Sequence, residues 1–172
     1  WLMLTKKNGH AGYTFTGGCA MLATLGEGNK ALQLLNMLKK EKLQPNTMYS
    51  EGGGQVIETP LSAVESINYL LLQSHDDIIR IFPALPDKWK NVSFRNFRAS
   101  GAFLISASAI DGYPDNIQIH SLKGNRLTMI NPYETAPIRI KDSNHNPIVF
   151  SYRGNQISFP TETGETYFIE KI

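Results

Sequence analysis

The pattern of apolar and polar residues changes near residue 76. Before that point apolar side chains recur every three or four residues, as in helices, whereas beyond it short runs alternate with a period of two, as in strands. The stretch LLLQSHDDIIRIFPALPDKW, residues 70–89, carries the change. We therefore predict an α+β protein with a helical part in residues 1–76 and an antiparallel β part in residues 77–172.

Three helices are predicted in the first part. The first covers residues 10–25, and the second covers residues 29–43 with Asn29 as its cap. The third starts at Thr59, an N-cap candidate that is followed by a proline, and runs to about His75. The apolar faces of these helices need other apolar elements to cover them, and the chain contains few such elements. We therefore expect the chain to be the C-terminal piece of a larger protein.

The second part reads as an antiparallel β-sandwich. Its apolar runs are short, and turn signals rich in Gly, Asn, Asp and Pro separate them. Such spacing is typical of a sandwich in which one face of each sheet is buried and the other is wet. The runs are IIRIF, VSFRNF, FLISASAI, NIQIHSL, RLTMI, PIRIK, PIVFSY, QISF and TYFIE.

Composition excludes several classes of function. The formal net charge is +2 with both signs scattered, which argues against a nucleic-acid-binding protein. The single cysteine, Cys19, allows no intrachain disulfide and is expected to be a buried small hydrophobe. No apolar run approaches the roughly 18 residues of a membrane span. The histidines are dispersed without metal-ligand spacing, so we predict no metal site and no cofactor.

The carboxylates around a glycine-rich loop are the most informative candidates for chemistry. Glu51 and Glu58 flank the loop, and Glu58 immediately precedes the third predicted helix. A carboxylate near a helix N-terminus is stabilised by the helix dipole and suits a general base. A capping or surface glutamate is the alternative. Tyr49 belongs to a set of aromatic residues that either stack on a sugar or fill the core, and His75 is either a helix cap or a site residue.

Residues 70–112 resemble the domain junction of family 95 glycoside hydrolases, the α-L-fucosidase and α-L-galactosidase type. Those proteins carry the pattern "LLQSH…I.LLPALP..W..G.V.GLRARGGFEV…W..G", and the stretch ATLGEGNKALQLL (23–35) resembles their "ARLGDG..A..LL" hairpin. Matching residues at the junction are Leu71, Leu72, Gln73, Ser74, His75, Pro83, Ala84, Leu85, Pro86, Trp89, Val92, Phe97, Arg98, Ala99, Gly101 and Phe103.

The resemblance implies an inverting glycosidase with an (α/α)₆-barrel catalytic domain followed by a small β-domain. The helices in residues 1–76 would be the last ones of that barrel. Inverting enzymes hold an acid and a base carboxylate about 6.5–9.5 Å apart. Counting back from the shared QSH without gaps places the family's base, an aspartate in a "QIDGNFGGTA" segment, on Glu58. The general acid would lie upstream of Trp1.

The local sequence departs from the family at the base. Residues 55–63 read QVIETPLSA, so glutamate replaces the aspartate, and the following glycine and asparagine become Thr59 and Pro60. Substrate and activity can therefore differ from those of the fucosidases. Glu51 is the fallback base, and we expect substrate contacts from Tyr49, Gln55 and His75.

Three functions remain open from the sequence. In the first, the parent protein hydrolyses an oligo- or polysaccharide, needs no cofactor, and is secreted or periplasmic, as the resemblance implies. The chain alone would then be inactive, because its barrel is completed by the missing N-terminal part of the same polypeptide. In the second, the β part is a non-catalytic carbohydrate-binding or structural module. In the third, the protein is an inactive relative of the glycosidases.

Overall fold

The chain forms an α+β structure, as predicted, and it divides into two compact units. The structure, a computed structural model, describes residues 12–46, 48–51 and 53–172. A helical unit comprises the residues up to Leu71 together with Pro83–Pro86, and a β unit comprises Leu72–Phe82 and Asp87–Ile172. Each unit has its own buried residues and is considered by itself.

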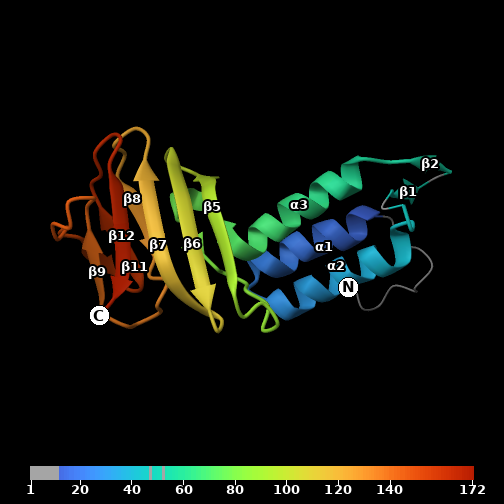
Figure 1. Cartoon of the computed structure of the whole chain (residues 1–172), viewed down its shortest axis with the longest axis horizontal. Coiled ribbons are helices and arrows are strands. Elements are labelled where there is room, and N and C mark those ends of the chain that lie inside the picture. The colour runs from blue at the N-terminus through green and yellow to red at the C-terminus, as the bar shows by residue number, and fades with distance from the viewer. Residues whose placement is uncertain (1–11, 47, 52) are drawn as a thin grey trace. The chain divides into compact units, whose positions relative to one another are not determined.

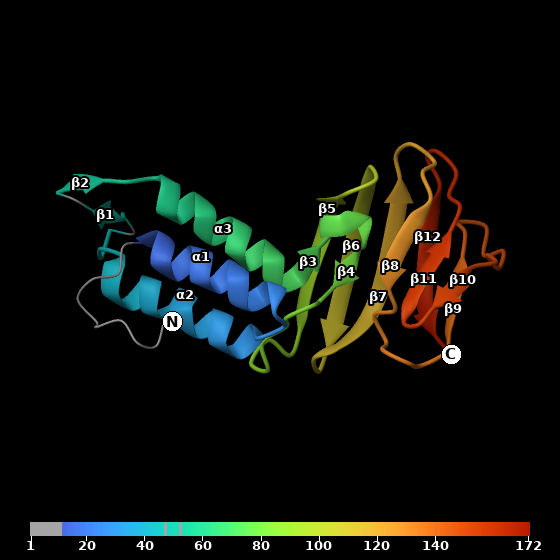
Figure 2. The same ribbon diagram turned by 180° about the vertical axis from the view of Figure 1, so that it is seen from behind.

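Three α-helices are present among the described residues of the helical unit. These are α1 (Gly12–Thr24), α2 (Gly28–Lys42) and α3 (Glu58–Leu71), and α1 lies between the other two (Figures 1 and 2). Phe15 of α1 and Leu38 of α2 pack with Tyr49 in a small core, which burial of such side chains stabilises by about 1.5–3 kcal/mol each. Cys19 is fully buried, which confirms the prediction.

Hydrogen bonds between small polar side chains join α1 to α3. The Ser62 hydroxyl donates to Thr16 Oγ1 over 2.8 Å, and the Ser66 hydroxyl donates to the Thr16 carbonyl oxygen over 2.8 Å. Thr16 and Ser66 are almost completely buried, so their polar atoms need such partners. The two helices can therefore approach closely without leaving these hydroxyls unsatisfied.

Two helix ends differ from the sequence predictions. The second helix begins at Gly28, and Glu27 rather than Asn29 takes the cap position. The third helix ends at Leu71 rather than near His75, because Leu72 and Gln73 pair with residues 80–81 as strands instead. The apolar run LLLQ is compatible with a helix or with a strand. Pairing with residues 80–81 makes its last two residues a strand.

Short and long strands make up the rest of the structure. A hairpin of β1 (Ser50–Glu51) and β2 (Gly54–Gln55) belongs to the helical unit, and His75–Asp77 of the β unit form the 3₁₀-helix η1. The β-unit strands are β3 (Leu72–Gln73), β4 (Arg80–Ile81), β5 (Val92–Ala99), β6 (Phe103–Ile110), β7 (Tyr113–Ser121), β8 (Leu127–Ile130), β9 (Ile138–Lys141), β10 (Ser151–Arg153), β11 (Gln156–Phe159) and β12 (Thr166–Lys171).

The β unit is an antiparallel sandwich. One sheet has the order β5-β6-β7-β12-β9, and the other has the order β10-β11-β8 and lies behind it in Figure 1. Alternate residues of both sheets point inward and are buried, among them Ile105, Ile119 and Phe159. The predicted run PIVFSY is strand only from Ser151 onward, and Val149 is 89% exposed.

Candidate active site

Four of the five predicted site residues lie in the segment that contains the β1–β2 hairpin and the start of α3. Tyr49 precedes β1, Glu51 ends it, and Gln55 ends β2 opposite Ser50. Glu58 follows three residues later as the first residue of α3. The fifth predicted residue, His75, lies in the β unit, where it is the first residue of η1.

Glu51 is held by two donors. The Tyr49 hydroxyl donates to Glu51 Oε2 over 2.5 Å, and the backbone N–H of Gly12 donates to the same oxygen over 3.4 Å. Tyr49 is only 2% exposed, and Glu51 is half-buried. These contacts fasten the hairpin to the first residue of α1 and fix the orientation of the Glu51 carboxylate.

The environment of Tyr49 keeps its phenol protonated. Burial raises the pKa of Tyr49, and the hydrogen bond to Glu51 and the negative charge of that carboxylate raise it further. The neighbouring Thr59 side chain and Gly12 backbone oppose part of the increase. Tyr49 is therefore a stable proton donor to Glu51 at neutral pH.

Thr59 and Gly12 complete this cluster, and sequence reasoning missed both roles. Thr59 is fully buried, and its Oγ1 has no hydrogen-bond partner among the residues that the structure describes. The N-cap predicted for Thr59 is therefore wrong. A Cβ added to Gly12 would lie 2.3 Å from the Tyr49 hydroxyl oxygen and 2.4 Å from Thr59 Oγ1, so no larger residue fits. The only indication of this close packing in the sequence was a glycine, Gly12, at the start of the first predicted helix.

Glu58 is the more accessible of the two carboxylates. It is exposed at the N-terminus of α3, where the unpaired N–H groups and the helix dipole stabilise a negative charge. Within the described ranges its carboxylate has neither a hydrogen bond nor an ion pair. A carboxylate in this position is free to bind a water molecule or a substrate hydroxyl.

The remaining candidates are exposed polar side chains. Gln55 lies at the end of a two-residue strand, and His75 is exposed at the start of η1. Their proposed contacts with a substrate stay predictions. The role that the structure gives Tyr49 is to position Glu51, since almost none of its ring is accessible.

Neither a metal-binding cluster nor a membrane-spanning helix occurs among the described residues, 12–46, 48–51 and 53–172. No group of three or more His, Cys, Asp or Glu side chains within these ranges is arranged so that it could hold a metal ion. None of the helices that the structure describes combines the length and apolar character required to cross a membrane.

Comparison with known proteins identifies a family model that matches the β part of the chain. The protein-family model described as "Glycoside hydrolase family 95, C-terminal domain" matches residues 73–169, which is more than half of the chain. No curated protein matches. Among solved structures, the chain is similar to the "Catalytic domain of GH30 xylanase C from Talaromyces cellulolyticus", with 12% identity and a TM-score of 0.32. That match covers 59% of this chain and 27% of the xylanase, and it is too distant to carry an argument.

Proposed function

The chain belongs to glycoside hydrolase family 95 and contains the C-terminal domain of that family, and we propose that it forms the C-terminal part of an enzyme that hydrolyses glycosidic bonds. The family match supports this class of reaction. The finer proposals concern the role of the helices, the general base and the stereochemistry. The first two are argued from the helical unit, and inversion is what the resemblance to the family implies.

The helices are proposed to be the last ones of an (α/α)₆ barrel. The observation that supports this is a set of large apolar side chains left exposed on α1, directly after its end and on α3. Met21 and Leu25 are 58% and 75% exposed, and Leu61 and Val64 are 61% and 57% exposed. Soluble proteins rarely leave such neighbouring apolar residues uncovered. In the parent protein, further helices of the same polypeptide would cover them.

Glu58 is proposed as the general base. Its carboxylate would take a proton from a water molecule, and the oxygen of that water would attack the anomeric carbon as the bond to the leaving oxygen breaks. A second carboxylic acid from the rest of the parent would protonate the leaving oxygen. The two groups would stand about 6.5–9.5 Å apart, which leaves room for the water and inverts the configuration. The Glu58 carboxylate is exposed and has no partner among the residues that the structure describes, which supports this assignment.

Glu51 is the second candidate for the base, but its contacts favour a positioning role. One of its carboxylate oxygens already accepts hydrogen bonds from Tyr49 and Gly12. Glu51 would therefore hold the hairpin that leads to Glu58. Gln55, on the same hairpin, would contact a substrate hydroxyl.

The full-length parent should be assayed with aryl α-L-fucoside and aryl α-L-galactoside, with proton NMR recording the anomer that forms first. The proposal predicts hydrolysis with the β-L sugar as the first product. A first product of α-L configuration would exclude inversion. Failure to cleave these or any other aryl glycosides would leave the protein as an inactive relative and contradict the proposed function.

A further inference from the structure

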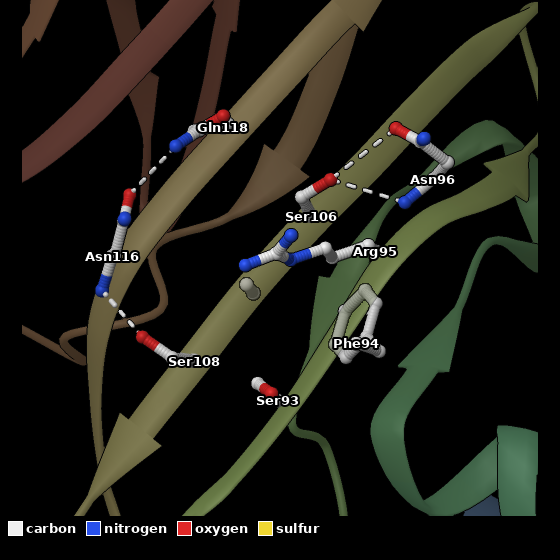
Figure 3. Close-up of a pocket in the computed structure, with 9 residues that line it drawn as sticks. Ser93, Phe94, Arg95, Asn96, Ser106, Ser108, Asn116 and Gln118 are labelled. Carbon is white, nitrogen blue, oxygen red and sulfur yellow. Dashed lines mark hydrogen bonds between the residues drawn. The ribbon is translucent and has the colours of Figure 1, made fainter.

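The outer face of the five-stranded sheet carries a groove of about 610 Å³ over β5, β6 and β7 (Figure 3). Residues of β6 alternate, so that Ala107 and Ile105 are buried between the sheets while Ser106 and Ser108 point to the opposite face. We call this hollow the sheet groove. It lies entirely within the β unit.

Two irregularities bend the strands around the sheet groove. The pairing of β5 with β6 shifts between Phe94 and Phe97, and the pairing of β6 with β7 shifts between Ala107 and Ala109. Bulges of this kind bend a strand and redirect its side chains. At the first, Asn96 adopts a φ of 55°, which is uncommon for a residue other than glycine.

Polar side chains line the sheet groove in a fixed arrangement. The N–H of Asn96 donates to Ser106 Oγ over 3.0 Å, and the N–H of Asn116 donates to Ser108 Oγ over 3.2 Å. The Gln118 amide donates to Asn116 Oδ1 over 3.2 Å. These bonds hold hydroxyl and amide groups in place before any ligand arrives, which lowers the entropy lost on binding.

Among the described residues that line the groove, Arg95 is the one with a charged side chain, and it extends across β6 between Ser106 and Ser108 (Figure 3). Its guanidinium has no hydrogen bond or ion pair within the part of the chain that the structure describes. The planar fork of N–H groups suits a pair of neighbouring oxygen atoms. The groove therefore offers a bidentate donor surrounded by groups that both donate and accept.

We propose that the sheet groove binds an oligosaccharide strand, separately from the site at Glu58. Sugar hydroxyls donate and accept hydrogen bonds, as the lining amides and serines do, and two vicinal hydroxyls or one carboxylate match Arg95. The half-buried Phe168 lies directly opposite Gln118 on the adjacent strand β12, and directly paired residues share a face of the sheet. Its ring can pack against the C–H face of a sugar. The inference rests on the proposed function for the class of ligand.

The test is an NMR titration of the whole 172-residue chain with cellohexaose, xylohexaose and hexagalacturonate, which separate neutral from carboxylated sugars. We expect amide shifts confined to β5, β6, β7 and β12 with at least one of the three. Arg95→Ala should weaken that binding at least about tenfold, which corresponds to about 1.4 kcal/mol, because it removes a charged hydrogen-bond donor. Gln118→Ala should weaken it less. The control, Arg153→Ala on β10 of the other sheet, should leave it unchanged.

Three results would overturn the inference. The first is the absence of amide shifts with all three sugars. The second is a set of shifts that is undiminished in the Arg95→Ala variant. The third is loss of binding in the full-length parent. The last result would mean that another domain occupies the sheet groove. Failure here is distinct from failure of the proposed function. A parent that cleaves glycosides without binding in the groove refutes only this inference, and one that binds sugars without cleaving any glycoside refutes only the proposed hydrolysis.

Discussion

The Tyr49 hydroxyl and the Glu51 carboxylate are joined by a hydrogen bond of 2.5 Å, which falls in the range of strong bonds to a charged acceptor. Because Gly12 donates to the same carboxylate oxygen, this pair connects the hairpin to the start of α1. The pair accounts for why a nearly buried tyrosine and a half-buried glutamate occur in residues 44–57, where the other described residues except Val56 are exposed.

Tyr49→Phe should lower the free energy of unfolding of the chain by about 1–3 kcal/mol, because it removes the main donor to a half-buried carboxylate. Tyr13→Phe is the matched control, since Tyr13 is 55% exposed on α1 and should change stability little. Urea denaturation of the two variants measures the difference. Equal effects in both would show that the hydroxyl of Tyr49 contributes nothing.

Gly28→Ala should destabilise the chain by about 1–3 kcal/mol, because the new Cβ would lie 2.2 Å from the Ala84 carbonyl oxygen and the backbone there would have to move. Gly17→Ala provides the comparison, since Gly17 lies within α1 with no atom within 4 Å of an added Cβ. This change should stabilise the chain by up to about 1 kcal/mol through helix propensity. Chemical denaturation should therefore give opposite signs, and equal signs would be inconsistent with the close approach of α2 to Ala84.

Alkaline pH should destabilise the β unit through Tyr133. Burial raises the pKa of Tyr133 from its ordinary value of 10.0 to about 12, and the charges of Asp115 and Glu170 contribute. The folded state thus favours the neutral phenol, so the contribution is fully present below pH 10 and is lost as the pH rises through about 12.

In Tyr133→Phe, the free energy of unfolding should fall less steeply with pH across this window. The variant should also lose stability at neutral pH, because the Tyr133 hydroxyl donates to the Asp115 carbonyl oxygen over 2.9 Å. Absorbance of tyrosinate during a pH titration identifies the group. Comparison of the two titration curves shows at which pH the absorbance of this one tyrosine is lost, and a loss near pH 10 rather than near pH 12 would contradict the assignment to Tyr133.

Much of the β unit could be predicted from the sequence, whereas its groove could not. Alternation of apolar and polar residues gave the strand from Phe103 to Ile110 correctly, because burial of one face imposes a period of two. Periodicity gives no information on bulges, so the left-handed Asn96 and the hollow beside it were missed. The outward serines of β6 looked like ordinary solvent-facing positions.

The helical unit shows a different limit. Helical spacing located α1 and α2, but the end of α3 was misplaced because pairing of Leu72 with Ile81 depends on residues far along the chain. The capping role expected of Thr59 was also wrong, because tertiary packing buries this side chain. The close packing of Gly12 against Tyr49 and Thr59 could not be predicted, because its only trace in the sequence is a single glycine.

The turnover of a Glu58→Gln variant of the full-length parent tests the account most directly. Glu58 is exposed at the start of α3, so this nearly isosteric change should leave folding intact. Loss of a general base should lower turnover by about 10²–10⁴-fold. Glu65→Gln, which changes another exposed glutamate of the same helix, should keep the turnover of the unaltered enzyme. Undiminished hydrolysis by the Glu58→Gln variant would remove Glu58 from the mechanism.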